Sequence, residues 1–137
     1  MYADKNGYIQ DSPARQMFCI VDGIVGGEGN GPLDPTPKPA GIIVAGENPV
    51  AVDLVCAGIM GFDFAKLPLP NRSFVAHPFP LVAFDACDVI AHSNDDNFGR
   101  NILLLRDPIF DFKPHFGWEG NIERADSTKS FSNLVTK

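Results

Sequence analysis

The sequence predicts an α/β fold: a small mixed sheet of about three to five strands with one well-defined buried helix, in two or three layers. Residues 17–22 and 40–45 are short apolar runs bounded by glycine or proline, which is typical of buried strands. Residues 49–60 form a longer apolar segment, and only a tight turn separates it from the run at 40–45. Together these features indicate a strand–turn–helix unit.

The helix predicted at 49–60 has boundary signals at both ends. Asn48 suits the N-cap, Pro49 suits the first helical position, and Gly61 suits the position just past the C-terminus. Asp53 is the only charged residue in this segment. Because an all-apolar helix is usually buried, we expect Asp53 to be buried or to point into a cleft, where its carboxylate needs a partner.

The other elements follow from shorter signals. Residues 85–92 suggest a third short strand and residues 101–106 another. Residues 32–39 contain four prolines and are expected to cross the surface as an extended, polyproline-like segment. The length of 137 residues favours one domain, which we place at residues 1–125, with a flexible C-terminal tail at residues 126–137.

Composition excludes several classes of function. The formal net charge is -6 and the pI is about 4.8, which argues against binding to nucleic acid or to an anionic membrane surface. The three cysteines are far apart and form no CxxC pair, so we expect no iron–sulfur cluster in this chain. Free thiols and the absence of a visible secretion signal predict a cytoplasmic location.

A glycine-rich stretch, DGIVGGEGNGP at residues 22–32, follows the first apolar run. Backbone N–H groups without neighbouring side chains can bind an anionic ligand. The candidate ligand-binding residues are Gly26, Gly27, Gly29, Asn30 and Gly31. The stretch lacks the Walker A and dinucleotide-binding patterns, and a proline-rich segment follows it instead of a helix. A purely structural turn is therefore the favoured alternative.

Three carboxylates form a candidate metal site: Asp22 at the end of the first strand, Glu28 in the glycine-rich stretch, and Asp53 near the start of the helix. Three such oxygen ligands would suit a divalent metal ion such as Mg²⁺, Mn²⁺ or Ca²⁺. The alternative is that Asp22 and Asp53 accept hydrogen bonds from loop N–H groups and hold the turn. His92, at a predicted strand end, is the one candidate for acid–base catalysis.

An ordered set of segments resembles the C-terminal half of the DUF362 family. The segments are DGIVGGEGNGP at 22–32, KP at 38–39, GII at 41–43, NPVAVD at 48–53 and MGFD at 60–63. The resemblance covers roughly residues 15–66, and more weakly residues 115–118. It implies an α/β domain that is often fused to, or found with, ferredoxin-like iron–sulfur modules. It also implies that the N-terminal half of such proteins is missing here.

Two functions are therefore expected. One is an enzyme domain, or half of one, that binds a metal ion or an anionic small ligand at the glycine-rich stretch. The alternative is a non-catalytic module that docks an iron–sulfur domain or another partner, such as the missing N-terminal half, with its phenylalanine-rich segments as the interface.

Overall fold

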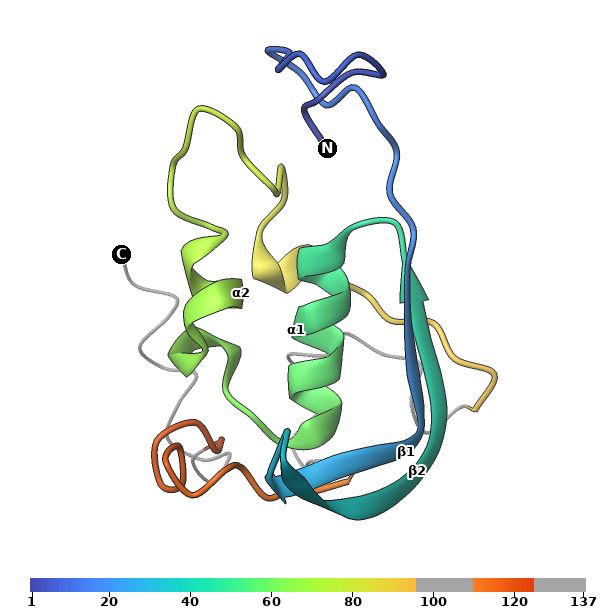
Figure 1. Ribbon diagram of the computed structural model, residues 1–137, viewed down its shortest axis with the longest axis vertical. Helices are drawn as coiled ribbons and strands as arrows, with labels where there is room; N and C mark the ends of the chain where they lie inside the picture. Colours follow the sequence, from blue (N-terminus) through green and yellow to red (C-terminus); the bar gives the residue numbers. More distant parts are fainter. Residues whose placement is uncertain (96–109, 125–137) are drawn as a thin grey trace.

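The computed structural model describes residues 1–95 and 110–124, and it combines a long β-hairpin with one principal helix (Figure 1). The hairpin runs along one side of the helix and bends beneath the helix's C-terminal end. The elements are β1 (Cys19–Asn30), β2 (Asp34–Gly46), α1 (Pro49–Met60), a short α2 (Pro68–Arg72), and single 3-10 turns at Phe64–Lys66 and Ala86–Asp88. Strand and helix are thus both present, but in the described residues the sheet has two antiparallel strands, not three to five.

The hairpin shows that two predictions from the sequence were wrong. Residues 22–30, expected as a loop, continue β1, and most of the expected polyproline-like crossing belongs to β2. Pro35, Pro37 and Pro39 occupy alternate positions of β2, so their nitrogens face the same edge of the strand. Proline is tolerated in a strand when its missing N–H faces an unpaired edge. The hairpin therefore accommodates a composition that, read locally, argues against a strand.

A bulge bends the hairpin near its middle. The pairing moves from Gly23–Ile42 to Val25–Pro39, so two residues of β2 lie opposite Ile24 alone. Gly41, one of those two residues, adopts a φ of 68°, which glycine reaches without steric strain.

Helix α1 begins and ends at the predicted residues. The Asn48 side chain accepts hydrogen bonds from the N–H groups of Val50 (2.9 Å) and Ala51 (3.2 Å), and Gly61 caps the other end with a φ of 89°. The predicted buried helix is confirmed, since most of its residues are buried. Two core clusters form around it, one with Leu54, Val55, Ile59 and Val89, the other with Ala57, Phe62, Phe112 and Ile122.

Residues 85–92 do not form the predicted strand. The backbone instead makes a 3-10 turn at Ala86–Asp88, where the Asp88 carboxylate accepts a hydrogen bond from the N–H of Asp85 (3.0 Å). This local closure competes with an extended conformation. The predicted strand at 101–106 and the predicted tail at 126–137 lie outside the described residues.

Candidate functional site

The glycines of the predicted ligand loop lie against other parts of the protein. A Cβ atom on Gly26 would come within 2.8 Å of the Phe112 ring, and one on Gly27 within 2.9 Å of the Pro35 Cβ. Gly29 has a φ of 75°, and its N–H donates to the Lys113 carbonyl (2.9 Å). Glycine at these three positions is therefore explained by the structure: close packing requires it at Gly26 and Gly27, and a left-handed backbone conformation favours it at Gly29.

Glu28 belongs to a small polar cluster at the hairpin tip. Its Oε2 lies 3.3 Å from Lys38 Nζ and accepts a hydrogen bond from the Lys113 N–H (3.1 Å), and its side chain is only 9% exposed. The Lys113 hydrogen bond, together with Lys38, lowers the pKa of Glu28 below its ordinary value of 4.5. Lys38 also donates to the Asp111 carbonyl and lies over the Phe112 ring. The cluster joins the hairpin to the segment at 110–113.

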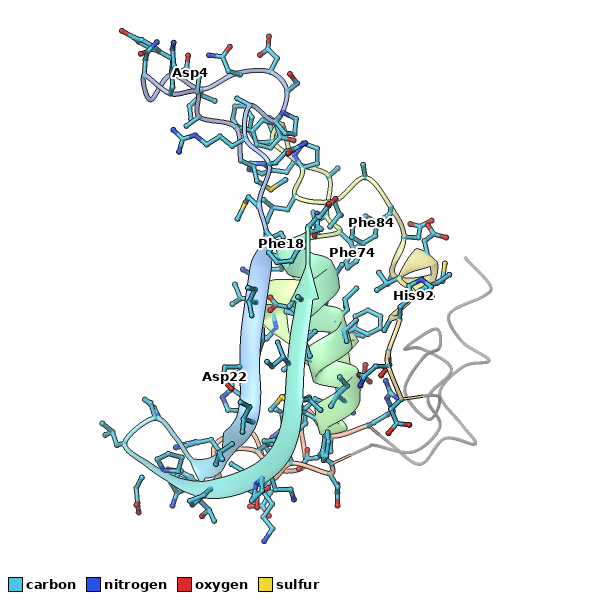
Figure 2. The ribbon with its side chains drawn as sticks, turned by 90° about the vertical axis from the view of Figure 1, so that its right-hand side faces the viewer. Asp4, Phe18, Asp22, Phe74, Phe84 and His92 are labelled. Carbon is cyan, nitrogen blue, oxygen red and sulfur yellow. The ribbon has the colours of Figure 1, made fainter. Side chains whose placement is uncertain are left out.

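Asp22 is exposed on β1, and its Oδ1 accepts a hydrogen bond from the Ile24 N–H (3.0 Å). This is the loop hydrogen bond expected under the structural alternative. Figure 2 shows Asp22 and His92 on opposite sides of the molecule, with the hairpin and α1 between them. The two residues therefore do not contribute to one site.

Asp53 is exposed, although the sequence predicted a buried or cleft position. The face of α1 that carries Asp53, Cys56 and Met60 is its least covered face, so the carboxylate reaches solvent. Partial desolvation by the apolar surroundings raises the pKa of Asp53 above its ordinary value. Burial, and then the charge of Asp53, raise the pKa of the Cys56 thiol, which makes it a poor nucleophile.

The three predicted metal ligands do not gather. Within the described part of the chain, no group of three or more His, Cys, Asp or Glu side chains is placed to hold a metal ion. Asp22 accepts a hydrogen bond from the Ile24 N–H near the bulge, and Glu28 forms an ion pair with Lys38. Asp53 lies exposed on α1. The geometry thus gives a divalent metal no preformed set of ligands from these residues.

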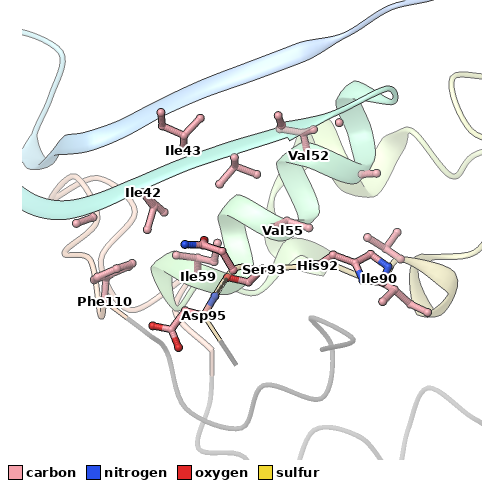
Figure 3. Close-up of a pocket in the computed structure, with 18 of the residues that line it drawn as sticks. Ile42, Ile43, Val52, Val55, Ile59, Ile90, His92, Ser93, Asp95 and Phe110 are labelled. Carbon is pink, nitrogen blue, oxygen red and sulfur yellow. Dashed lines mark hydrogen bonds between the residues drawn. The ribbon is translucent and has the colours of Figure 1, made fainter. Parts of the chain in front are cut away.

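His92 lies at the rim of a groove of about 680 Å³ (Figure 3). One side of the groove is formed by residues 40–46 of β2, the floor by apolar residues of α1, and the far side by residues 89–95 together with Phe110. His92 is exposed and makes no hydrogen bond within residues 1–95 and 110–124. The histidine therefore has no orienting partner there of the kind that acid–base catalysis uses.

Sequence reasoning did not find this groove. The available signal is the apolar run at 40–45, which by itself predicts a buried strand. The structure instead covers one face of β2 with α1 and leaves one edge of the strand facing the groove.

Residues 1–58 match the family model described as Domain of unknown function (DUF362). The DUF362 match covers the hairpin and most of α1. It lies in the N-terminal region of the chain, and it stops before residues 60–63 and 115–118, which the sequence analysis included. The comparisons with curated proteins and with solved structures gave no match. None of the helices in residues 1–95 and 110–124 is long and apolar enough to cross a membrane.

The packing of Gly26 leads to a stability prediction. Gly26→Ala places a methyl group against the Phe112 ring, and we expect the free energy of unfolding to fall by about 1–3 kcal/mol. Urea denaturation followed by circular dichroism measures the change. Gly31→Ala is the matched control, because its Cβ would lie 3.8 Å from Pro35, in ordinary contact. Equal stability of the two variants would contradict the close packing of Phe112 on β1.

The lowered pKa of Glu28 predicts a pH dependence of stability. A carboxylate whose folded-state pKa is depressed stabilises the fold above its ordinary pKa of 4.5, and this contribution is lost as the pH falls through the folded-state value. The stability difference between wild type and Glu28→Gln should therefore shrink as the pH falls below about 4.5. Denaturation at several pH values tests this, with Glu47→Gln, at an exposed position, as control. A difference independent of pH would be inconsistent with the ion pair.

Proposed function

We propose that this chain is a non-catalytic docking module that binds another protein domain through the outer face of its hairpin. The observation that carries the proposal is a group of large apolar side chains exposed on one face of the hairpin: Ile20 (67%), Ile43 (65%) and Ile24 (54%). Contiguous apolar side chains on a protein surface mark interaction sites, whereas scattered ones are ordinary.

The register supports treating Ile20 and Ile43 as one face, and Ile24, four residues after Ile20 in β1, extends it. Ile42 and Val44 pack against the core cluster on α1, so Ile43 between them faces the opposite side of the strand. Ile20 pairs with Ala45, which makes Ile20 and Ile43 diagonal neighbours on that outer face. A hairpin with one solvated face normally carries polar residues there.

The energy available from this face is substantial. Full burial of a valine or isoleucine side chain stabilises by about 1.5–3 kcal/mol. Three such side chains could supply a large part of the hydrophobic stabilisation of an interface, although side-chain ordering and polar desolvation oppose it. This exposed face is therefore better suited to binding the surface of another protein than to binding a small ligand.

The family resemblance suggests the class of partner. Two candidates follow from it: the remaining part of a DUF362 protein, and a ferredoxin-like iron–sulfur domain. An iron–sulfur partner would bring its own ligands, because Cys19, Cys56 and Cys87 lie on separate elements as free thiols. The predicted cytoplasmic location is compatible with either partner.

The alternative, an enzyme domain that binds a metal ion or an anion at the glycine-rich stretch, has less support. Phe112 and Pro35 pack against Gly26 and Gly27, the backbone positions that a ligand would need. Asp22 and Glu28 already accept hydrogen bonds from the chain's own N–H groups.

The docking proposal predicts self-association of the isolated chain, because the outer face is then uncovered. Sedimentation at increasing concentration should show reversible oligomers for the wild type and a monomer for the Ile20→Asp/Ile43→Asp double variant, with an unchanged circular dichroism spectrum. Tyr8→Ser and Leu69→Ser are matched controls, since these residues are exposed (70% and 81%) but lie outside the hairpin, and they should associate like the wild type. A monomeric wild type, or a double variant that still associates, would count against the proposal.

A further inference from the structure

We propose that the partner docked on the outer face of the hairpin is a different protein whose apolar surface carries one lysine or arginine, and that this side chain forms an ion pair with Asp22. The inference deepens the docking proposal and rests on it. It gives Asp22 a role in the choice of partner, beyond the hydrogen bond that its carboxylate accepts from the Ile24 N–H.

Asp22 lies within the apolar outer face, not at its margin. It pairs with Ile43 across the hairpin, and side chains directly opposite each other in an antiparallel pair lie on the same face. Ile20 and Ile24 lie two residues before and two residues after Asp22 in β1, which places them on that face as well. Figure 2 shows Asp22 on the side of the hairpin that faces away from α1. Three exposed isoleucines therefore surround the carboxylate.

No basic side chain of the hairpin neutralises Asp22. β1 contains no lysine, arginine or histidine, and the basic residue of β2 is Lys38, which pairs with Glu28 (3.3 Å) and lies over the Phe112 ring. Within residues 1–95 and 110–124, the Ile24 N–H is the one partner of the Asp22 side chain, and it is bound to Oδ1. Oδ2 is therefore able to accept hydrogen bonds from another molecule.

Covering the isoleucines with another protein would also remove water from the Asp22 carboxylate. An ionised carboxylate that loses its water without gaining a partner of opposite charge destabilises an interface. A lysine or arginine opposite Asp22 supplies both the opposite charge and N–H donors. A wholly apolar partner surface is disfavoured, and an acidic one is disfavoured more strongly. Charge complementarity therefore selects a partner with a basic residue within its apolar surface.

The same carboxylate makes a second copy of this chain a poor partner. Two identical copies that pair through one face are related by a twofold axis, so residues near the centre of the face meet their own counterparts. Asp22 lies between Ile20 and Ile24 and opposite Ile43, so the two Asp22 carboxylates would meet and repel each other. The self-association that the docking proposal predicts should therefore be weak at low salt.

The test uses a partner of known chemistry, namely a copy of the full chain with the change Asp22→Lys. Sedimentation of this variant mixed with the wild type at low salt should show association about tenfold tighter than either protein shows alone, because opposite charges then meet. High salt should reduce the difference, since it screens exposed charges. Asp34→Lys is the matched control: it makes the same change of charge at an exposed position of the hairpin tip, and mixing it with the wild type should not tighten association.

Asp22→Asn separates the charge from the hydrogen bond. The asparagine oxygen still accepts from the Ile24 N–H, while the negative charge is lost. This variant should associate with itself several-fold more tightly than the wild type at low salt and should show no preference for the Asp22→Lys variant. Circular dichroism checks that each variant folds, and if Asp22→Lys does not, the comparison of Asp22→Asn with the wild type decides the question.

The outcomes separate this inference from the docking proposal. If the wild type alone associates as tightly as the mixture and as Asp22→Asn, a second copy fits the face equally well; the ion-pair inference then fails while the docking proposal stands. The Ile20→Ser/Ile43→Ser variant removes apolar surface without changing the charge, so it should not associate with Asp22→Lys. If it still associates as the wild type does, the isoleucines are not the interface and both proposals fail.

Discussion

The structure depends on the packing of one face of the hairpin against α1. A two-stranded hairpin is at best marginally stable alone, so its long strands need a second layer. Ile42 and Val44 pack against the core around Leu54, while at Gly46 a Cβ atom would lie only 2.9 Å from the Val52 side chain. This contact fixes which residues of each strand face inward. It therefore also determines which residues form the outer face and which edge of β2 borders the groove.

The hairpin tip has its own support, which explains the unusual composition there. The segment at 110–113 hydrogen-bonds to the end of α1 through Phe110 and Phe112 and then crosses the glycines of β1. The ion pair between Glu28 and Lys38 lies beside it. Glycine at position 26 lets an aromatic ring approach the backbone, so the absence of side chains is used for packing within the protein.

Local signals predicted local structure well. Asn48, Pro49 and Gly61 gave the bounds of α1, because capping depends on residues close in sequence. The strands at 17–22 and 40–45 were found, but their continuation through glycines and prolines was not, since cross-strand pairing overrides local preference. The predicted position of Asp53 was wrong, because no local pattern shows which face of an apolar helix the rest of the chain leaves exposed to solvent. The groove was missed for the same reason: it is formed by segments far apart in sequence.

The most direct test of this account measures which hairpin methyl groups reach solvent. A soluble paramagnetic agent relaxes exposed methyl protons in an NMR spectrum of the monomeric chain. The account predicts strong relaxation for Ile20, Val25 and Ile43, and weak relaxation for Ile42 and Val44, which pack against α1. Similar relaxation of Ile42 and Ile43 would contradict the assignment of an inner and an outer face, and with it the basis of the docking surface.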